Sequence, residues 1–263
     1  MTAPALISTD FDGTLIDHES ATPFPPQLGE LLSRFQANGG RWVINTGRTL
    51  WHTEEGITMF LNGACPNFVI ASEREIYHAT ADGTWESDEV WNTRCFTEHE
   101  RMFQESAPFL ERCATWLRKH TRTQEMMENG VLNGIIAESE PEMERILEWL
   151  ESNSHGTQEL SWQRNMIYLR FCHRDYSKGS ALGHLAGTLG LMPEQVFAAG
   201  DHHNDLSMLD GKYARMLACP VNAIEAVRKL VRQGDGMVSH ARCGSGVLEA
   251  LATLMPELAA DLL

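Results

Sequence analysis

The chain has 263 residues, of which 43% are hydrophobic and 22% are charged, as is ordinary for a globular protein. This length is enough to bury a substantial core, in one large domain or in two modest ones. The formal net charge of −15 at pH 7 argues against a nucleic-acid or anionic-membrane surface, because both need basic patches.

Targeting signals and cysteine usage indicate where in the cell the protein is located. No apolar run approaches the roughly 18 to 20 residues of a transmembrane helix, and the start of the chain lacks the basic and apolar segments of a signal peptide. The six cysteines are scattered without a C-x-x-C pair, which favours reduced thiols over disulfides or a zinc site. We therefore expect a cytoplasmic protein that binds neither nucleic acid nor membrane. The sequence leaves open whether it forms a homo-oligomer.

The first predicted element is a short buried strand over residues 5–9, and it ends in the motif D-x-D-G-T. Because alternate strand residues point to the same face, Asp10 and Asp12 can face one site. Two close carboxylates repel each other unless a cation or a shared proton relieves them, and a hard divalent ion such as Mg²⁺ does so. Gly13 permits a sharp turn, and Thr14 can cap the next segment or donate to an anion. The same D-x-D-G-T motif is also compatible with an acidic surface turn that has no functional role.

Helices and strands alternate after this motif. The apolar spacing predicts a helix over 26–38, a strand at 42–44, a helix over 49–61 and a strand at 68–71. Strands that alternate with helices imply right-handed β-α-β crossovers, and therefore a parallel, doubly wound α/β sheet.

The pattern changes after a predicted turn at Asp82-Gly83. The elements predicted beyond this turn are a helix over 98–120, a strand over 131–137, a helix over 141–153, and a β pair at 160–162 and 166–172. Together they form a small α+β unit that interrupts the larger sheet. We predict that residues 1–83 and 173–263 form a core domain and that residues 84–172 form an inserted domain.

The alternation resumes in the last third of the chain. The predicted elements are helix 178–189, strand 196–199, helix 203–209, strand 214–217, helix 222–231, a short strand near 237–238 and helix 246–254. No internal repeat or low-complexity linker interrupts them. The organisation is therefore an α/β core split by one insertion.

Two further polar groups stand where predicted elements of the core meet. The hydroxyl of Thr46 and the amide of Gly47 follow the second strand and can bind an anion at a helix N-terminus, although a simple N-cap turn also fits. Arg48 either reaches a substrate or pairs with a carboxylate of the core. Lys178 opens the helix after the insertion, as a point cation for a ligand or as a solvated surface charge.

A third polar group, G-D-H-H-N-D, follows the strand at 196–199. Its carboxylates Asp201 and Asp205 and its amide Asn204 fit a metal site and an acidic helix start equally well. The neutral imidazoles of His202 and His203 can bind a transition metal, but solvent-facing residues at a helix start explain them more simply.

In chain order, D-x-D-G-T, T-G-R, Lys178 and G-D-x-x-N-D each stand at the edge of the predicted core. This arrangement resembles the haloacid dehalogenase-like phosphohydrolases, and all four of their sequence motifs are matched. The insertion between the second and third motifs resembles the C2-type cap of the Cof-type and sucrose-phosphate-phosphatase-like branch. The run over 70–77 also looks like the sucrose-phosphatase segment that leads into the cap. The resemblance implies a Rossmann-like core with a cap domain at 84–172.

The resemblance also implies roles at the reacting centre. Asp10 would attack phosphorus and form an aspartyl-phosphate that water hydrolyses, while Asp12 would act first as general acid and then as general base. Mg²⁺ would be held by Asp10, by the main-chain carbonyl of Asp12 and by Asp201, with Asp205 supporting the site from behind.

The remaining motif residues would bind the substrate. Thr46, Gly47 and Lys178 would hold the phosphoryl oxygens, and Asn204 would orient Lys178 or the phosphate. Arg48 would contribute to substrate binding. Every residue that this chemistry requires is present at its motif position.

We therefore expect a Mg²⁺-dependent phosphatase that hydrolyses a small phosphorylated metabolite, with a sugar phosphate as the leading substrate class. A phosphomannomutase-like enzyme is the first alternative, since it would return the phosphoryl group to the sugar. The run Leu206-Ser207-Met208 after the last motif looks more like the hydrolases. A non-catalytic sugar-phosphate-binding protein is the second alternative, and it would not need Asp12 as an acid.

Overall fold

The computed structural model describes residues 3–262 of the chain. The chain divides into two compact units. The core unit combines the chain up to Asn92 with the chain from Ser177 onward, and the inserted unit is Thr93–Tyr176. Both boundaries fall later than those expected at 83/84 and 172/173. The first does so because the sheet of the core unit continues through two further strands, up to Ser87.

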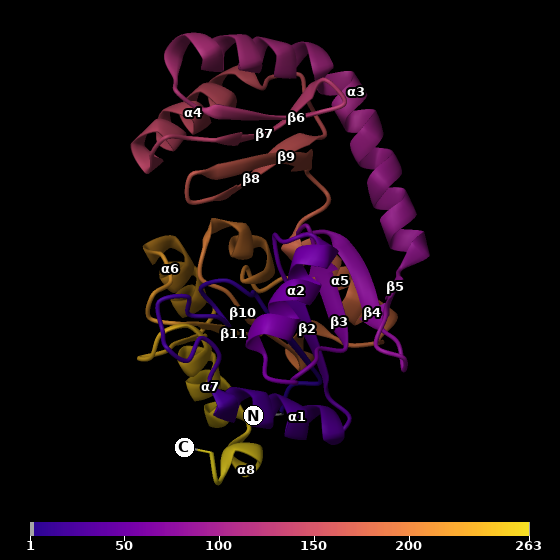
Figure 1. The fold of residues 1–263 in the computed structure, drawn as a ribbon, viewed down its shortest axis with the longest axis vertical. Coiled ribbons are helices and arrows are strands. Elements are labelled where there is room, and N and C mark those ends of the chain that lie inside the picture. Colours follow the sequence, from indigo (N-terminus) through magenta and orange to yellow (C-terminus); the bar gives the residue numbers. More distant parts are fainter. Residues whose placement is uncertain (1–2, 263) are drawn as a thin grey trace. The chain divides into compact units, whose positions relative to one another are not determined.

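The core unit is built on an eight-stranded sheet with the strand order β12-β11-β10-β1-β2-β3-β4-β5 (Figure 1). The strands from β12 to β3 are parallel, whereas β4 and β5 add an antiparallel edge. The predicted doubly wound α/β architecture is confirmed. The strands are β1 (Leu6–Thr9), β2 (Arg41–Asn45), β3 (Phe68–Ala71), β4 (Glu75–Ala79), β5 (Trp85–Ser87), β10 (Val196–Ala199), β11 (Met216–Cys219) and β12 (Met237–Val238).

Alternation along the strands explains why both faces of this sheet are covered. In β10, Phe197 packs into one hydrophobic cluster while its neighbours Val196 and Ala198 pack into the other. One cluster includes residues of α1 (Pro26–Ala37), α2 (Leu50–Phe60), α7 (Cys243–Leu254) and α8 (Pro256–Ala259). The opposite cluster includes residues of α5 (Lys178–Thr188) and α6 (Glu225–Gln233).

Strand β1 lies between β2 and β10, with Thr9 in register with Ile44 on one side and with Ala199 on the other. The chain passes from β1 to β2 and β3 and returns to β10 only after the insertion. This reversal of strand order is a topological switch point, and ligands of open α/β sheets bind beyond the carboxyl ends of the strands there. The polar motifs after β1, β2 and β10 are therefore brought to one edge.

The inserted unit contains a four-stranded antiparallel sheet with the order β6-β7-β9-β8. Its hydrophobic core joins this sheet to two helices, which confirms the predicted α+β character. The elements are α3 (Glu89–His120), whose first turn belongs to the core unit, β6 (Gln124–Glu128), β7 (Val131–Ile136), α4 (Glu140–Asn153), β8 (Leu160–Asn165) and β9 (Tyr168–His173). Helix α3 begins at Glu89 rather than at 98, because the carboxylate of Asp88 accepts a hydrogen bond from the Trp91 amide at 3.0 Å and caps the helix.

Several other elements differ from the sequence-based expectations. Residues His203–Met208 form a 3₁₀ helix rather than an α-helix, and β11 begins at Met216 rather than at 214. Strands β4, β5 and β6 and helix α8 were not predicted. The missed strands carry polar residues, so their apolar alternation is weak; β5 and β6 are edge strands, and β4 lies between β3 and β5. Within residues 3–262, which include all six cysteines, no disulfide forms. None of the helices in this range combines the length and apolar character needed to cross a bilayer.

Candidate active site

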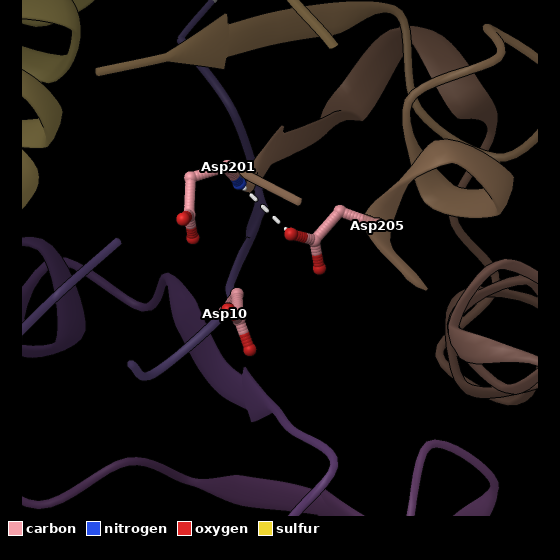
Figure 2. Close-up of side chains that lie close together, drawn as sticks. All are labelled: Asp10, Asp201 and Asp205. Atoms are coloured by element: carbon pink, nitrogen blue, oxygen red, sulfur yellow. Dashed lines mark hydrogen bonds between the residues drawn. The ribbon is translucent and has the colours of Figure 1, made fainter. Parts of the chain in front are cut away.

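Three carboxylates from two distant segments meet at the switch point (Figure 2). Asp10 follows β1, whereas Asp201 and Asp205 follow β10, and one oxygen of each lies within 4.8 Å of the other two. The Asp10 amide donates to the Ala199 carbonyl at 2.9 Å, so the parallel pairing of β1 with β10 continues up to the site. The sheet itself therefore holds these acids together.

Lys178, at the first turn of α5, lies fully buried among these acids. Its Nζ donates to Oδ1 of Asp10 at 2.6 Å and to Oδ1 of Asp205 at 2.7 Å. Burial by itself would lower the pKa of this ammonium group, but the charges of Asp10 and Asp205 outweigh burial and raise its pKa. Lys178 therefore remains a cation and is not the solvated surface lysine that the sequence left open.

The charges of the site do not balance within the protein. With all three carboxylates ionised, the single ammonium leaves two negative charges in excess at a largely buried place. Burial and the charge of Asp205 raise the pKa of Asp10 well above its ordinary value and that of Asp201 to about 7, although Lys178 and Thr14 act in the opposite direction. A divalent cation with a preference for oxygen ligands relieves this excess, and Mg²⁺ fits both the charge and the donors.

The carboxylate of Asp205 supports the site from behind. Its Oδ2 accepts the backbone amides of Asp201 at 2.8 Å and of His202 at 2.9 Å, while its Oδ1 accepts from Lys178. These bonds fix the turn that carries Asp201. Asp205 is therefore suited to position its neighbours, and Asp10 and Asp201 have the more available oxygens.

Gly13 and Thr14 complete the turn after β1. The hydroxyl of Thr14 donates to Oδ1 of Asp201 at 2.7 Å. Gly13 has a φ of +78°, and a Cβ atom there would lie 2.5 Å from Oδ2 of Asp201. Glycine is therefore required at this position both by the backbone conformation and by the close approach of Asp201.

The side chain of Asp12 lies apart from the three-carboxylate cluster and pairs with Arg48. Nε of Arg48 donates to Oδ2 of Asp12 at 2.7 Å, and Nη2 donates to Oδ1 at 2.6 Å. His18 Nε2 lies 2.7 Å from the same Oδ1. Burial opposes the charge of Asp12, but the hydrogen bonds from Arg48 and His18 outweigh burial and lower its pKa.

Of the two roles that the sequence allowed for Arg48, the structure shows pairing with a carboxylate of the core. The guanidinium of Arg48 also lies 4.9 Å from the centre of the Phe11 ring. Sequence reasoning missed His18. The only signal for it was a histidine placed six residues after Asp12.

The turn after β2 lies close to a fourth acid, Glu73. Thr46 is buried and its Oγ1 accepts the Arg48 amide at 3.2 Å. Beside it, a Cβ atom on Gly47 would lie 3.3 Å from Oε1 of Glu73. The same Oε1 accepts a hydrogen bond from Nδ2 of Asn204 at 2.8 Å. Asn204 therefore reaches this turn, and Glu73, which follows β3, is a second residue that sequence reasoning missed.

The two histidines after Asp201 do not join the carboxylate cluster. Their rings contact each other, with 3.3 Å between the two Nδ1 atoms. Within residues 3–262, the only group of acids, histidines and cysteines that can hold a metal ion consists of Asp10, Asp201 and Asp205. A transition-metal site at His202 and His203 is not found there.

Comparisons with known proteins identify the family and the fold. The sequence profile of the haloacid dehalogenase-like hydrolases matches residues 67–251. A candidate phosphatase of Streptococcus pyogenes serotype M6 is 37% identical over 83 residues. That match spans 28% of this chain and 29% of the streptococcal protein.

Solved structures resemble nearly the whole chain. The sucrose-phosphatase of Synechocystis sp., solved in complex with sucrose and phosphate, has a TM-score of 0.70 at 17% identity and covers 96% of this chain and 98% of its own. A haloacid dehalogenase-like hydrolase of Bacteroides thetaiotaomicron has a TM-score of 0.62 at 19% identity, covering 95% of this chain and 99% of its own. At these identities the likeness establishes the fold.

Proposed function

This chain belongs to the haloacid dehalogenase-like hydrolases, and from that premise we propose that it is a Mg²⁺-dependent phosphomonoester hydrolase. The observation that carries the proposal is the meeting of Asp10, Asp201 and Asp205 around Lys178, with two negative charges in excess. The proposed substrate is a small phosphorylated metabolite, and a sugar phosphate is the leading class. The fold shared with a sucrose-phosphatase supports that class.

Asp10 is the proposed nucleophile. Its carboxylate attacks phosphorus, the bond from phosphorus to the ester oxygen breaks, and an aspartyl-phosphate forms that water then hydrolyses. Asp10 and Asp201 would hold Mg²⁺ together with the main-chain carbonyl of Asp12, and Asp205 would support them. When bound, Mg²⁺ supplies positive charge that allows the anionic phosphate to approach an anionic side chain.

Asp12 is the proposed general acid for the leaving alcohol and the general base for the attacking water. Both of its oxygens accept hydrogen bonds from Arg48, and the pairing favours the deprotonated form. To act as the acid, Asp12 must therefore loosen its pairing with Arg48 and His18 and take up a proton from solvent before it donates that proton to the leaving alcohol. The deprotonated form suits the second step, in which Asp12 takes a proton from water.

The phosphoryl oxygens would be held by Thr46, Gly47 and Lys178. The Thr46 hydroxyl accepts one bond from the Arg48 amide and keeps its hydrogen for a ligand. Lys178 cannot leave its carboxylate partners, so its charge acts from a fixed position. Arg48, though paired with Asp12, would contact the substrate beyond its phosphate in this scheme.

A panel of phosphorylated sugars and polyols tests the proposal. Purified full-length protein should release inorganic phosphate from at least one member when Mg²⁺ is present and should lose this activity in excess chelator. Asp82→Asn, an exposed change on the turn between β4 and β5, serves as the control and should match the wild type. Formation of an isomeric sugar phosphate without phosphate release would favour the mutase instead. Tight binding without any turnover would favour a sensor.

A further inference from the structure

One buried carboxylate beside the site has no part in the proposed chemistry. Glu73 is 6% exposed, and its Oε1 accepts a hydrogen bond from Nδ2 of Asn204 at 2.8 Å. The same oxygen lies close enough to Gly47 that a Cβ atom there would be 3.3 Å away. Glu73 therefore borders the turn that would hold a phosphoryl group, although a carboxylate repels one.

The backbone that carries Glu73 is strained. Ser72 has a φ of 50° and Glu73 a φ of 66°, so two successive non-glycine residues lie in the left-handed region. Such strain persists only where the surroundings impose it, and it concentrates at functional sites. Two backbone hydrogen bonds tie this turn to the loop after β2. The Ser72 amide donates to the Arg48 carbonyl at 2.7 Å, and the Glu73 amide donates to the Thr46 carbonyl at 2.8 Å. At the end of the turn, the Arg74 amide donates to the Ala71 carbonyl at 3.0 Å, and the Arg74 carbonyl accepts from Nε1 of Trp91 at 2.6 Å.

The carboxylate also determines how the amide of Asn204 is turned. Because an ionised carboxylate only accepts hydrogen bonds, the NH₂ group of Asn204 must face Glu73. The amide oxygen Oδ1 is then directed elsewhere. Asn204 is 7% exposed, and Oδ1 is buried without a donor among residues 3–262. A buried acceptor without a donor is costly, so a bound group that carries a hydrogen would satisfy it.

We propose that Glu73 is a positioning residue that turns Asn204 so that Oδ1 accepts a hydrogen bond from a protonated oxygen of the bound anion. This inference rests on the proposed phosphate-binding role of the site. It makes specific the expectation that Asn204 orients Lys178 or the phosphate, because it assigns Asn204 the part of an acceptor. Its consequence is selectivity, because hydrogen phosphate carries a hydrogen, whereas sulfate has the same shape and charge without one. A buried acceptor rejects the ligand that leaves it unpaired.

The test compares the affinities of inorganic phosphate and sulfate for the full-length protein with Mg²⁺ at pH 8, by titration calorimetry. The wild type should bind phosphate about tenfold or more tightly than sulfate. Glu73→Ala frees the amide to rotate, and the ratio of the two affinities should fall toward one. Glu73→Gln keeps an acceptor oxygen and should restore the ratio. Glu75→Ala is the matched control, since Glu75 contacts Tyr77 instead, and it should leave the ratio unchanged.

Two further variants separate positioning from a loss of structure. Asn204→Ala removes the acceptor and should lower the ratio as Glu73→Ala does, and the double variant should lower it no further. Glu73→Gly suits a φ of 66° and removes the carboxylate without adding strain, so it replaces Glu73→Ala if that variant misfolds.

An unchanged affinity ratio in a folded Glu73→Ala or Glu73→Gly variant overturns the inference, as does equal affinity of the wild type for both anions. The proposed function is judged separately, by phosphate release from esters. A wild type that hydrolyses esters without preferring phosphate over sulfate refutes only the positioning role. A wild type that prefers phosphate but hydrolyses no ester refutes only the hydrolase proposal.

Discussion

The two units of the chain both bury charged side chains, but they neutralise them differently. In the inserted unit, Glu142 is 4% exposed, and its oxygens accept the backbone amides of Arg122 at 3.0 Å and Glu138 at 2.9 Å. Arg164 is 8% exposed and donates to the Met166 carbonyl and to Glu144, a largely exposed carboxylate. Each buried charge of this unit has its own local partners.

In the core unit, Asp10 and Asp205 share the ammonium of Lys178, and the half-buried Asp201 lies beside them without an ion pair to it. A structural ion pair has no reason to retain two uncompensated negative charges in a buried place, because each costs free energy of desolvation. Burial alone therefore does not distinguish a functional charge from a structural one. Excess charge of one sign does, since it requires a ligand from outside the chain.

The largest expected effect is on turnover, with Asp10→Asn. The amide keeps the shape of the side chain but is a poor nucleophile, so hydrolysis of an aryl phosphate should fall at least about a thousandfold. Circular dichroism and thermal unfolding should show an intact fold. Glu142→Gln, at a buried carboxylate of the inserted unit, should retain most of the activity. Substantial turnover in Asp10→Asn would exclude Asp10 as the nucleophile.

The second effect is on stability, with Lys178→Met. Removing the ammonium leaves Asp10 and Asp205 buried without a counter-charge, which should lower the free energy of unfolding by about 3–5 kcal/mol. Arg164→Met should cost less, because Glu144 is exposed enough to regain water. Urea unfolding of both variants in chelator measures the difference. An equal loss of unfolding free energy in Lys178→Met and Arg164→Met would show that the two units do not differ in how they neutralise buried charge.

The third effect is metal-dependent stabilisation. Mg²⁺ at a hundred times its dissociation constant should raise the free energy of unfolding by about 2.7 kcal/mol, because it binds only the folded state. Thermal unfolding with and without Mg²⁺ measures this gain. Asp201→Asn should lose it, and Glu142→Gln should keep it. A gain that survives Asp201→Asn would place the metal elsewhere in the molecule.

The smallest effect is the pH dependence of stability in excess chelator, and its sign differs between the units. The pKa of Asp201 is raised to about 7 by burial and by Asp205, so its folded form binds more protons than the unfolded form, and stability falls as pH rises toward 7. Burial opposes the charge of Glu142, yet backbone hydrogen bonds lower its pKa. Its contribution is therefore present above the ordinary value and is lost as pH falls through the lowered one.

Urea unfolding between pH 3 and 8 measures both contributions. The stability of Asp201→Asn relative to the wild type should increase from pH 5 to pH 8. The deficit of Glu142→Gln, roughly 1 kcal/mol at neutral pH, should shrink below pH 4. Parallel stability curves for the wild type and Asp201→Asn would show that the pKa of Asp201 is not raised.

Sequence patterns were most informative where one local rule dominates. Short apolar runs located β1, β2, β3 and β10, since a strand buried on both faces is apolar along nearly its whole length. Strands β4 and β5 escaped notice because an antiparallel edge tolerates polar residues. The 3₁₀ helix after Asp201 looked like an α-helix because its residues are compatible with either.

The contacts of the site were less accessible to sequence reasoning. The pairing of Arg48 with Asp12 spans 36 residues, and that of Glu73 with Asn204 spans 131. No periodicity encodes such pairs. Sequence reasoning therefore named Asp10, Asp12, Asp201 and Asp205 but missed Glu73, whose partner Asn204 lies far along the chain. It also missed His18, which is only six residues from Asp12 but carries no motif signal.

The sequence by itself determined that short buried strands end in carboxylates, a hydroxyl and an amide, because alternation and turn chemistry act over a few residues. Only the tertiary structure decided that β1 lies between β2 and β10, so that acids almost two hundred residues apart share Lys178. The reason is physical. Burial follows from the local hydrophobic pattern, whereas the charge balance of a site depends on which distant side chains the fold brings within a few ångströms.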